Sequence, residues 1–246
     1  MVLPIDARLS ERHGNVMAVF SFPRALVLVG GGALSAEVLD TACAALGGDP
    51  PLVAADGAGD RLWSMGRQPS VIIGDLDSLE DPGAWASRGV AVHHVAEQDS
   101  TDFDKCLRLT SAPLYLGVGF TGRRLDHTLA VLNAMSRHPD KAVVLLSEDD
   151  CVLHLRAGLR LGLPLGVGAP VSLFPLRPVR PGHCGGLVWP LQGLLLAPSG
   201  LEGGVIGTSN RASGSDVTLE MQDDGVLALL PPGALTDVLN ALTGDR

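Results

Sequence analysis

Short apolar runs alternate with amphipathic segments over about the first 150 residues of this 246-residue chain. The run at 25–32 predicts a buried strand ending in a glycine turn, and 35–46 predicts a helix capped by Ser35. Strands alternating with helices are typical of βαβ units, so we predict a largely parallel, Rossmann-like sheet with helices. Further strands are predicted at 51–56, 70–74, 90–95, 114–119 and 142–147, and further helices at 59–66, 81–89, 100–111 and 123–138. The helix at 81–89 has Asp81 as its expected cap and Pro82 at its first position.

The pattern changes near Cys151. Glycine and proline then interrupt short apolar pieces, and a helical period returns only at 233–244. Frequent turn signals between short strands are typical of an antiparallel sandwich or barrel. We therefore predict an α/β domain over residues 1–150 and an all-β, sandwich-like or barrel-like domain over residues 151–246.

Composition narrows the class of protein. Hydrophobic residues make up 46% of the chain and aromatic residues only 4%, which predicts an aliphatic core. The net charge of −9 argues against a nucleic-acid or anionic-membrane partner, because both favour basic patches. Four widely spaced cysteines, no signal-like start and no long apolar run lead us to expect a cytoplasmic protein with reduced thiols.

Acids, glycines and basic residues follow the predicted strands at the point where each strand ends. Because ligands bind beyond the carboxyl ends of parallel strands, we expect these side chains to converge on one edge of the sheet. They are Gly30, Gly31, Gly32, Asp56, Gly57, Asp75, Asp77, Asp99, Ser100, Thr101, Asp102, Gly122, Arg123, Arg124, Asp126 and His127.

This combination favours metal-assisted chemistry on a nucleotide phosphate. Clustered carboxylates repel one another unless a cation is present, and oxygen ligands suit Mg2+ with substrate phosphates. Arginines bind phosphate oxygens in bidentate fashion, and the helix starts at Ser35 and Ser100 offer amide donors. Each motif also has a structural interpretation: the glycines as a tight turn, the Asp-x-Asp pair as an Asx-turn, and Thr101 as a helix cap.

Five motifs, taken in order, resemble the thiamine pyrophosphokinase family: "AADGAGDRLW", "PSVIIGDLDS", "DSTDFDKCL", "GFTGRRLDHTLAVLN" and "GTSNRASG". The resemblance covers about residues 25 to 230. It implies a nucleotide-binding α/β domain followed by a β-rich domain, and a homodimer that binds thiamine between its subunits. It also implies Mg2+-dependent transfer of pyrophosphate from ATP to the thiamine hydroxyl, giving thiamine diphosphate and AMP.

The resemblance also implies roles for individual residues. Asp75, Asp77 and Asp102 would bind the metal and, with Arg124, carry out catalysis. ATP would be bound by Asp56, Gly57, Thr101, Lys105, Gly122, Arg124, Asp126 and His127. Thiamine would be bound by Gln98, Asp99, Ser209 and Asn210, the last two from the β-rich domain.

One departure concerns thiamine recognition. No Phe, Trp or Tyr follows Trp189, although some family members stack an aromatic residue of the β-rich domain near thiamine. Two other functions remain open from the residues alone. One is a metal-dependent nucleotidyltransferase that releases pyrophosphate, and the other is a non-enzymatic nucleotide-sensing module.

Overall fold

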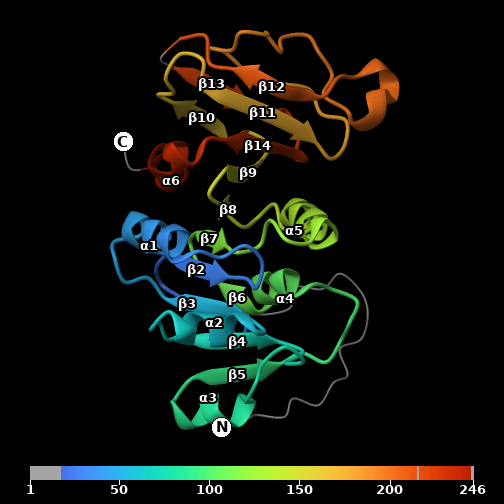
Figure 1. Ribbon diagram of the computed structural model, residues 1–246. Coiled ribbons are helices and arrows are strands. Elements are labelled where there is room, and N and C mark those ends of the chain that lie inside the picture. Colours follow the sequence, from blue (N-terminus) through green and yellow to red (C-terminus); the bar gives the residue numbers. More distant parts are fainter. Residues whose placement is uncertain (1–17, 215, 245–246) are drawn as a thin grey trace. The chain divides into compact units, whose positions relative to one another are not determined.

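The computed structural model describes residues 18–214 and 216–244. These residues form two compact units, one up to Val131 and the other from Leu132 onward. Helix α5, Leu125–Arg137, runs across this division. The predicted mixed α/β fold is confirmed, with parallel strands in the first unit and antiparallel strands in the second (Figure 1).

The first unit contains a parallel sheet with the strand order β7-β2-β3-β4-β5. Its four strands other than β5 are buried throughout, which fits their continuous apolar sequences, since a parallel sheet is covered on both faces. A short parallel pair, β1 with β6, accompanies it. The bounds are β1 Phe20–Ser21, β2 Leu26–Val29, β3 Leu52–Ala55, β4 Val71–Gly74, β5 Ala91–His94, β6 Thr110–Ser111 and β7 Tyr115–Val118.

Helices connect these strands, and three of them begin at the residues that the sequence predicted as caps. Ser35 accepts from the backbone of Val38, Asp81 caps a helix with Pro82 in its first turn, and Thr101 accepts from Asp104. Helix α4 packs against β3 and β4, which places its first turn near the carboxyl ends of those strands. The helices are α1 Ala36–Ala45, α2 Ala58–Ser64, α3 Pro82–Ser87 and α4 Asp102–Leu109.

The second unit contains antiparallel strands in the order β12-β11-β14-β9-β8, together with the pair β10 and β13. Strand β8 was predicted as part of the first domain, but it pairs antiparallel with β9 inside this unit. Its elements are β8 Val143–Leu146, β9 Cys151–Leu155, β10 Arg160–Leu163, β11 Pro170–Pro175, η1 Pro198–Gly203, β12 Gly207–Arg211, β13 Val217–Glu220, β14 Val226–Leu230, η2 Pro232–Ala234 and α6 Leu235–Thr243. Closure into a barrel or sandwich stays a prediction.

The core of the described residues is aliphatic, as the composition predicted, with Trp85, Tyr115 and Phe103 as its largest aromatic members. Within that part of the chain, no helix combines the length and apolar character needed to cross a bilayer.

Candidate active site

A cavity of about 730 Å³ lies in the first unit, beyond the carboxyl ends of its parallel strands. Its lining comes from the turns after β2, β3, β4 and β7 and from the first turns of α4 and α5. This volume lies within the range typical of sites for small ligands. Eleven of the residues to which the family resemblance assigns a role line it: Asp56, Gly57, Asp75, Asp77, Gln98, Thr101, Asp102, Lys105, Gly122, Arg124 and His127.

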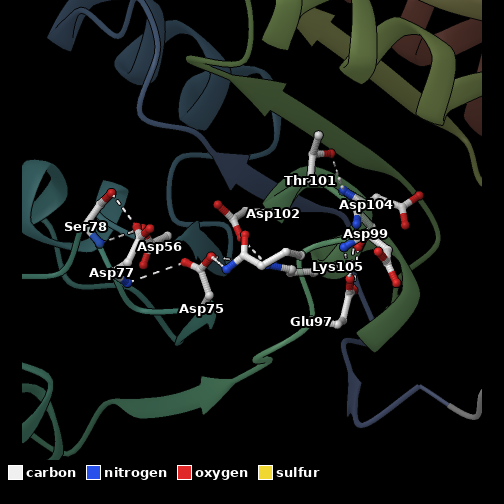
Figure 2. Close-up of polar contacts among 12 residues, drawn as sticks. Asp56, Asp75, Asp77, Ser78, Glu97, Asp99, Thr101, Asp102, Asp104 and Lys105 are labelled. Atoms are coloured by element: carbon white, nitrogen blue, oxygen red, sulfur yellow. Dashed lines mark hydrogen bonds and ion pairs between the residues drawn. The ribbon is translucent and has the colours of Figure 1, made fainter.

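Three carboxylates meet in this cavity (Figure 2). Asp56 follows β3, Asp75 follows β4, and Asp102 begins α4. One oxygen atom of each lies within 4.8 Å of the others, a spacing that allows all three to hold one cation. We call these three residues the carboxylate cluster. The family resemblance implied Asp77, and not Asp56, as the third metal ligand.

Asp56 is held in an unusual backbone conformation. Its φ is +47°, in the left-handed region, and its side chain is only 4% exposed. Strand β4 passes so close that a Cβ on Gly74 would lie 2.7 Å from the Asp56 Cβ. Glycine at position 74 therefore allows the Asp56 carboxylate to sit at the sheet edge.

The Asp56 carboxylate is incompletely satisfied. Its Oδ2 accepts from the Ser78 backbone N–H at 3.1 Å, but its buried Oδ1 has no hydrogen-bond partner among the described residues. Burial raises the pKa of Asp56, and the nearby charge of Asp75 adds to this, while the nearby donor groups of Gly57 and Ser78 oppose it. A buried carboxylate that has an unpartnered oxygen and lies in the lining of a cavity is a natural ligand for a cation.

Asp75 is the better-stabilised carboxylate. Gln98 Nε2 donates to its Oδ2 at 2.5 Å, the Asp77 backbone N–H approaches its Oδ1 at 3.4 Å, and Lys105 Nζ lies 3.8 Å from its Oδ2. Burial alone would raise the pKa of Asp75, but these donors and the Lys105 charge outweigh it and lower the pKa. Asp75 is therefore the member of the carboxylate cluster that ionises most readily.

Asp102 shares the same lysine. Lys105 Nζ donates to Asp102 Oδ1 at 3.1 Å, one helical turn along α4. Burial raises the pKa of Asp102, the Lys105 ammonium opposes that rise, and the charges of Asp56 and Asp75 reinforce it. Thr101 caps the helix through Asp104 N–H and so fixes where Asp102 stands.

A second charged network, which sequence reasoning missed, shapes the segment before α4. Glu97 accepts from Asp99 N–H at 2.9 Å, from Ser100 N–H at 3.1 Å and from Ser100 Oγ at 2.6 Å. Arg108 pairs with Glu97, and its Nε lies 3.2 Å from an Asp104 oxygen. In the sequence, the i,i+4 spacing of Asp104 and Arg108 was the one pattern that could have indicated this network. This network holds the segment that carries Gln98 to Asp75.

Arg61 is another contributor that the sequence did not reveal. Its guanidinium donates to the carbonyls of Gly31 at 2.8 Å, Gly32 at 2.6 Å and Leu34 at 3.0 Å. These bonds fix the glycine turn after β2, which lines the cavity. Burial, with the nearby charge of Arg123, lowers the pKa of Arg61.

The other predicted residues of the first unit lie outside the carboxylate cluster, and only some of them line the cavity. Asp77 is exposed and accepts from Ser78 Oγ at 2.8 Å, outside the carboxylate cluster. Arg124 forms an exposed two-point pair with Asp126, whose pKa is lowered to about 2 by that hydrogen bond. Asp126 and Asp99 do not line the cavity within the described part of the chain.

The two predicted residues of the second unit differ in their surroundings. Asn210 is buried, accepts from Trp189 N–H at 3.1 Å and donates to the Trp189 carbonyl at 2.7 Å. Ser209 is exposed, has a φ of +63°, and its N–H donates to Ser172 Oγ at 3.0 Å. Asn210 thus fixes the position of Trp189, which is 56% exposed.

Comparisons with known proteins point to one family. Residues 47–145 match the family described as thiamin pyrophosphokinase, catalytic domain. The predicted resemblance to thiamine pyrophosphokinases is confirmed. The chain is 32% identical over 175 residues to thiamine pyrophosphokinase 1 of Arabidopsis thaliana, covering 64% of this chain and 63% of that relative. It therefore spans somewhat less than two thirds of the length of this thiamine pyrophosphokinase.

Solved thiamin pyrophosphokinases share the fold. The structure from Geobacillus thermodenitrificans superposes with a TM-score of 0.66 at 22% identity, covering 84% of this chain and 96% of that one. The yeast structure has a TM-score of 0.66 at 18% identity and covers 94% and 97%. The matched family region contains the whole carboxylate cluster.

Proposed function

We propose that this chain transfers pyrophosphate from ATP to the hydroxyl of thiamine, giving thiamine diphosphate and AMP. The observation that carries the proposal is the carboxylate cluster with its orphaned Asp56 oxygen, inside a cavity of ligand size and inside the region that matches the catalytic-domain family. The names of the matched relatives supply the substrate class.

The carboxylate cluster fits a hard divalent cation, and we propose Mg2+. Three oxygens lie within 4.8 Å of one another, and the Asp56 Oδ1 has no other partner among the described residues. Asp56, Asp75 and Asp102 would hold the ion, in place of the set with Asp77 that the sequence suggested. When bound, the ion would offset negative charge on the phosphate oxygens of ATP.

The reaction then requires positioning more than covalent chemistry from the protein. The thiamine hydroxyl oxygen forms a bond to the β-phosphorus, the bond from that phosphorus to the α,β-bridging oxygen breaks, and AMP leaves with that oxygen. The hydroxyl proton passes to a cavity carboxylate. The glycine turn held by Arg61 lets the backbone approach the phosphates, and Arg123 and Arg124 line the same cavity.

Other parts of the proposal rest on the resemblance. The second domain would contribute Ser209 and Asn210 to the thiamine site, with Gln98 and Asp99 on the catalytic side. Trp189, positioned by Asn210 and half exposed, would be the aromatic residue that stacks on thiamine. Assembly as a homodimer is part of the same proposal, and a cytoplasmic location stays a prediction from the sequence.

Product analysis tests the proposal. The purified chain is incubated with ATP, Mg2+ and thiamine, and the products are identified by mass; we expect thiamine diphosphate and AMP. Asp75→Asn should lower turnover at least about 100-fold, because it removes an anionic ligand and leaves the fold intact. Asp40→Asn, which removes a surface carboxylate paired with Arg67, is the matched control.

Three outcomes would contradict this function. Release of pyrophosphate would indicate a nucleotidyltransferase, and ADP with thiamine monophosphate would indicate ordinary phosphoryl transfer. Nucleotide binding without any turnover would indicate a sensing module.

A further inference from the structure

Lys105 is buried in an environment that normally excludes lysine. It projects from α4 and its side chain is only 2% exposed, although an isolated ammonium is costly to bury. Figure 2 shows it reaching toward Asp102, with its Nζ 3.1 Å from Asp102 Oδ1 and 3.8 Å from Asp75 Oδ2. Its burial is therefore compensated by two members of the carboxylate cluster.

Two other cationic side chains that line the cavity are engaged elsewhere. Arg61 donates to the backbone carbonyls of the glycine turn, and Arg124 pairs with Asp126. Among the ion pairs of the described residues, Lys105 is the cation that reaches Asp75 and Asp102. The carboxylate cluster thus has the positive charge of Lys105 beside it before any ligand binds.

The carboxylate cluster and Lys105 together carry a net negative charge. Three ionised carboxylates and one ammonium leave two negative charges, which one divalent cation would balance. Lys105 also contacts Asp102 Oδ1 and approaches Asp75 Oδ2, so an entering cation would meet both a repelling charge and ligands already in use. The flexible four-carbon stem of lysine allows its ammonium to turn toward another anion, such as a phosphate oxygen.

We propose that Lys105 is an internal counter-ion that weakens binding of a divalent cation to the free protein, so that the cation is held firmly only together with a phosphate-bearing substrate. The inference rests on the metal site of the proposed function, and it goes beyond it by giving this lysine a restraining role. It predicts that removing the Lys105 charge increases metal affinity while it impairs use of the nucleotide.

The test is titration with Mn2+ in the absence of nucleotide and thiamine, with free Mn2+ measured by electron paramagnetic resonance. Lys105→Met keeps most of the length of the side chain and removes the charge; we expect it to bind Mn2+ at least roughly tenfold more tightly than the unaltered protein. Lys105→Arg, which keeps the charge, should bind Mn2+ like the unaltered protein. Lys141→Met, the same change at a lysine outside the cavity lining, is the control.

Equal or weaker Mn2+ binding by Lys105→Met would overturn the proposal, and so would tighter binding by Lys105→Arg. Circular dichroism checks that each variant is folded, and Lys105→Gln carries the same prediction should the methionine variant not fold. Because the titration needs no turnover, its result stands apart from the product analysis. A chain that makes no thiamine diphosphate but binds Mn2+ as predicted would contradict the proposed function alone.

Discussion

Replacing Asp56 by Asn should make the protein more stable and at the same time weaken its metal site. The Asp56 Oδ1 is buried with no hydrogen-bond partner among the described residues, and one carboxylate oxygen of Asp56 lies within 4.8 Å of oxygens of Asp75 and Asp102. Asparagine keeps an acceptor for the Ser78 N–H and tolerates the left-handed φ of +47° at this position. Its amide N–H groups would donate toward the two neighbouring carboxylates, where Asp56 can only repel them.

The size of the gain follows from the distances. Two unit charges 4.8 Å apart repel by about 0.9 kcal/mol in water and by about 3.5 kcal/mol at an effective dielectric constant of about 20. Lys105 offsets part of this, so we expect the free energy of unfolding to rise by about 1–3 kcal/mol. For a chain of this size, each kcal/mol corresponds to an increase of about 2–4 °C in Tm.

The pH dependence provides an internal check. Burial raises the pKa of Asp56, so the folded protein holds this proton at a pH where the unfolded chain has released it. Stability due to this group is therefore full below the ordinary value of 3.8 and falls as the pH rises through the folded pKa. The difference between Asp56→Asn and the unaltered protein should be small at acidic pH and reach a plateau above the folded pKa.

Thermal unfolding without metal, followed by circular dichroism across this pH range, measures the effect, and Mn2+ titration measures the loss of metal affinity. Asp56→Ala is the comparison variant, because it removes the same charge but also the acceptor for Ser78 N–H and places alanine in a left-handed conformation. An Asp56→Asn protein that is less stable at neutral pH, or that binds Mn2+ as well as before, would refute this reasoning.

Three further predictions concern other parts of the molecule. Arg108→Gln removes the guanidinium that holds Glu97, so we expect a loss of about 1 kcal/mol in chemical denaturation and weaker Mn2+ binding, with Arg108→Lys recovering part of both. Gly30→Ala places a Cβ 2.6 Å from the Gly119 carbonyl oxygen and should cost about 1–3 kcal/mol, measured by the same denaturation. Burial lowers the pKa of His154, so the stability that this group contributes above pH 6.5 should fall as the pH falls toward the folded pKa. In thermal unfolding, His154→Gln should reduce this dependence of Tm on pH, and an unchanged dependence would contradict the role given to His154.

Much of the first unit could be predicted because its signals are local. Continuous apolar runs marked the parallel strands, and Ser35, Asp81 with Pro82, and Thr101 marked helix starts by hydrogen bonds to residues three positions ahead. The convergence of Asp56, Asp75 and Asp102 on one cavity also followed from strand order, since parallel strands present their carboxyl ends at one edge.

Features that depend on spatial contacts between distant residues could not be predicted. Nothing near Asp56 in the sequence shows that Gly74 packs against it, or that its Oδ1 has no hydrogen-bond partner in the described part of the chain. Asp77 looked equivalent to Asp75 by spacing, but the turn at Leu76, with a φ of +65°, directs the chain so that Asp77 is exposed. The Arg61 bonds to carbonyls thirty residues away are equally invisible to local patterns.

The second unit was harder for a related reason. Short apolar pieces between glycines and prolines predict strands, but not which strands pair, because antiparallel partners are chosen by packing across long sequence separations. Strand β8 has the buried apolar sequence of a parallel strand and nevertheless pairs antiparallel with β9. Asn210 is likewise occupied by backbone contacts with Trp189 that its motif did not reveal.

The most direct measurement follows the β-phosphorus of ATP. With ATP labelled at that position, Mg2+ and thiamine, transfer of pyrophosphate in one step predicts that the label appears in thiamine diphosphate and that the AMP formed in equal amount is unlabelled. Label recovered in free pyrophosphate or in ADP, with none in thiamine diphosphate, would contradict the proposed function.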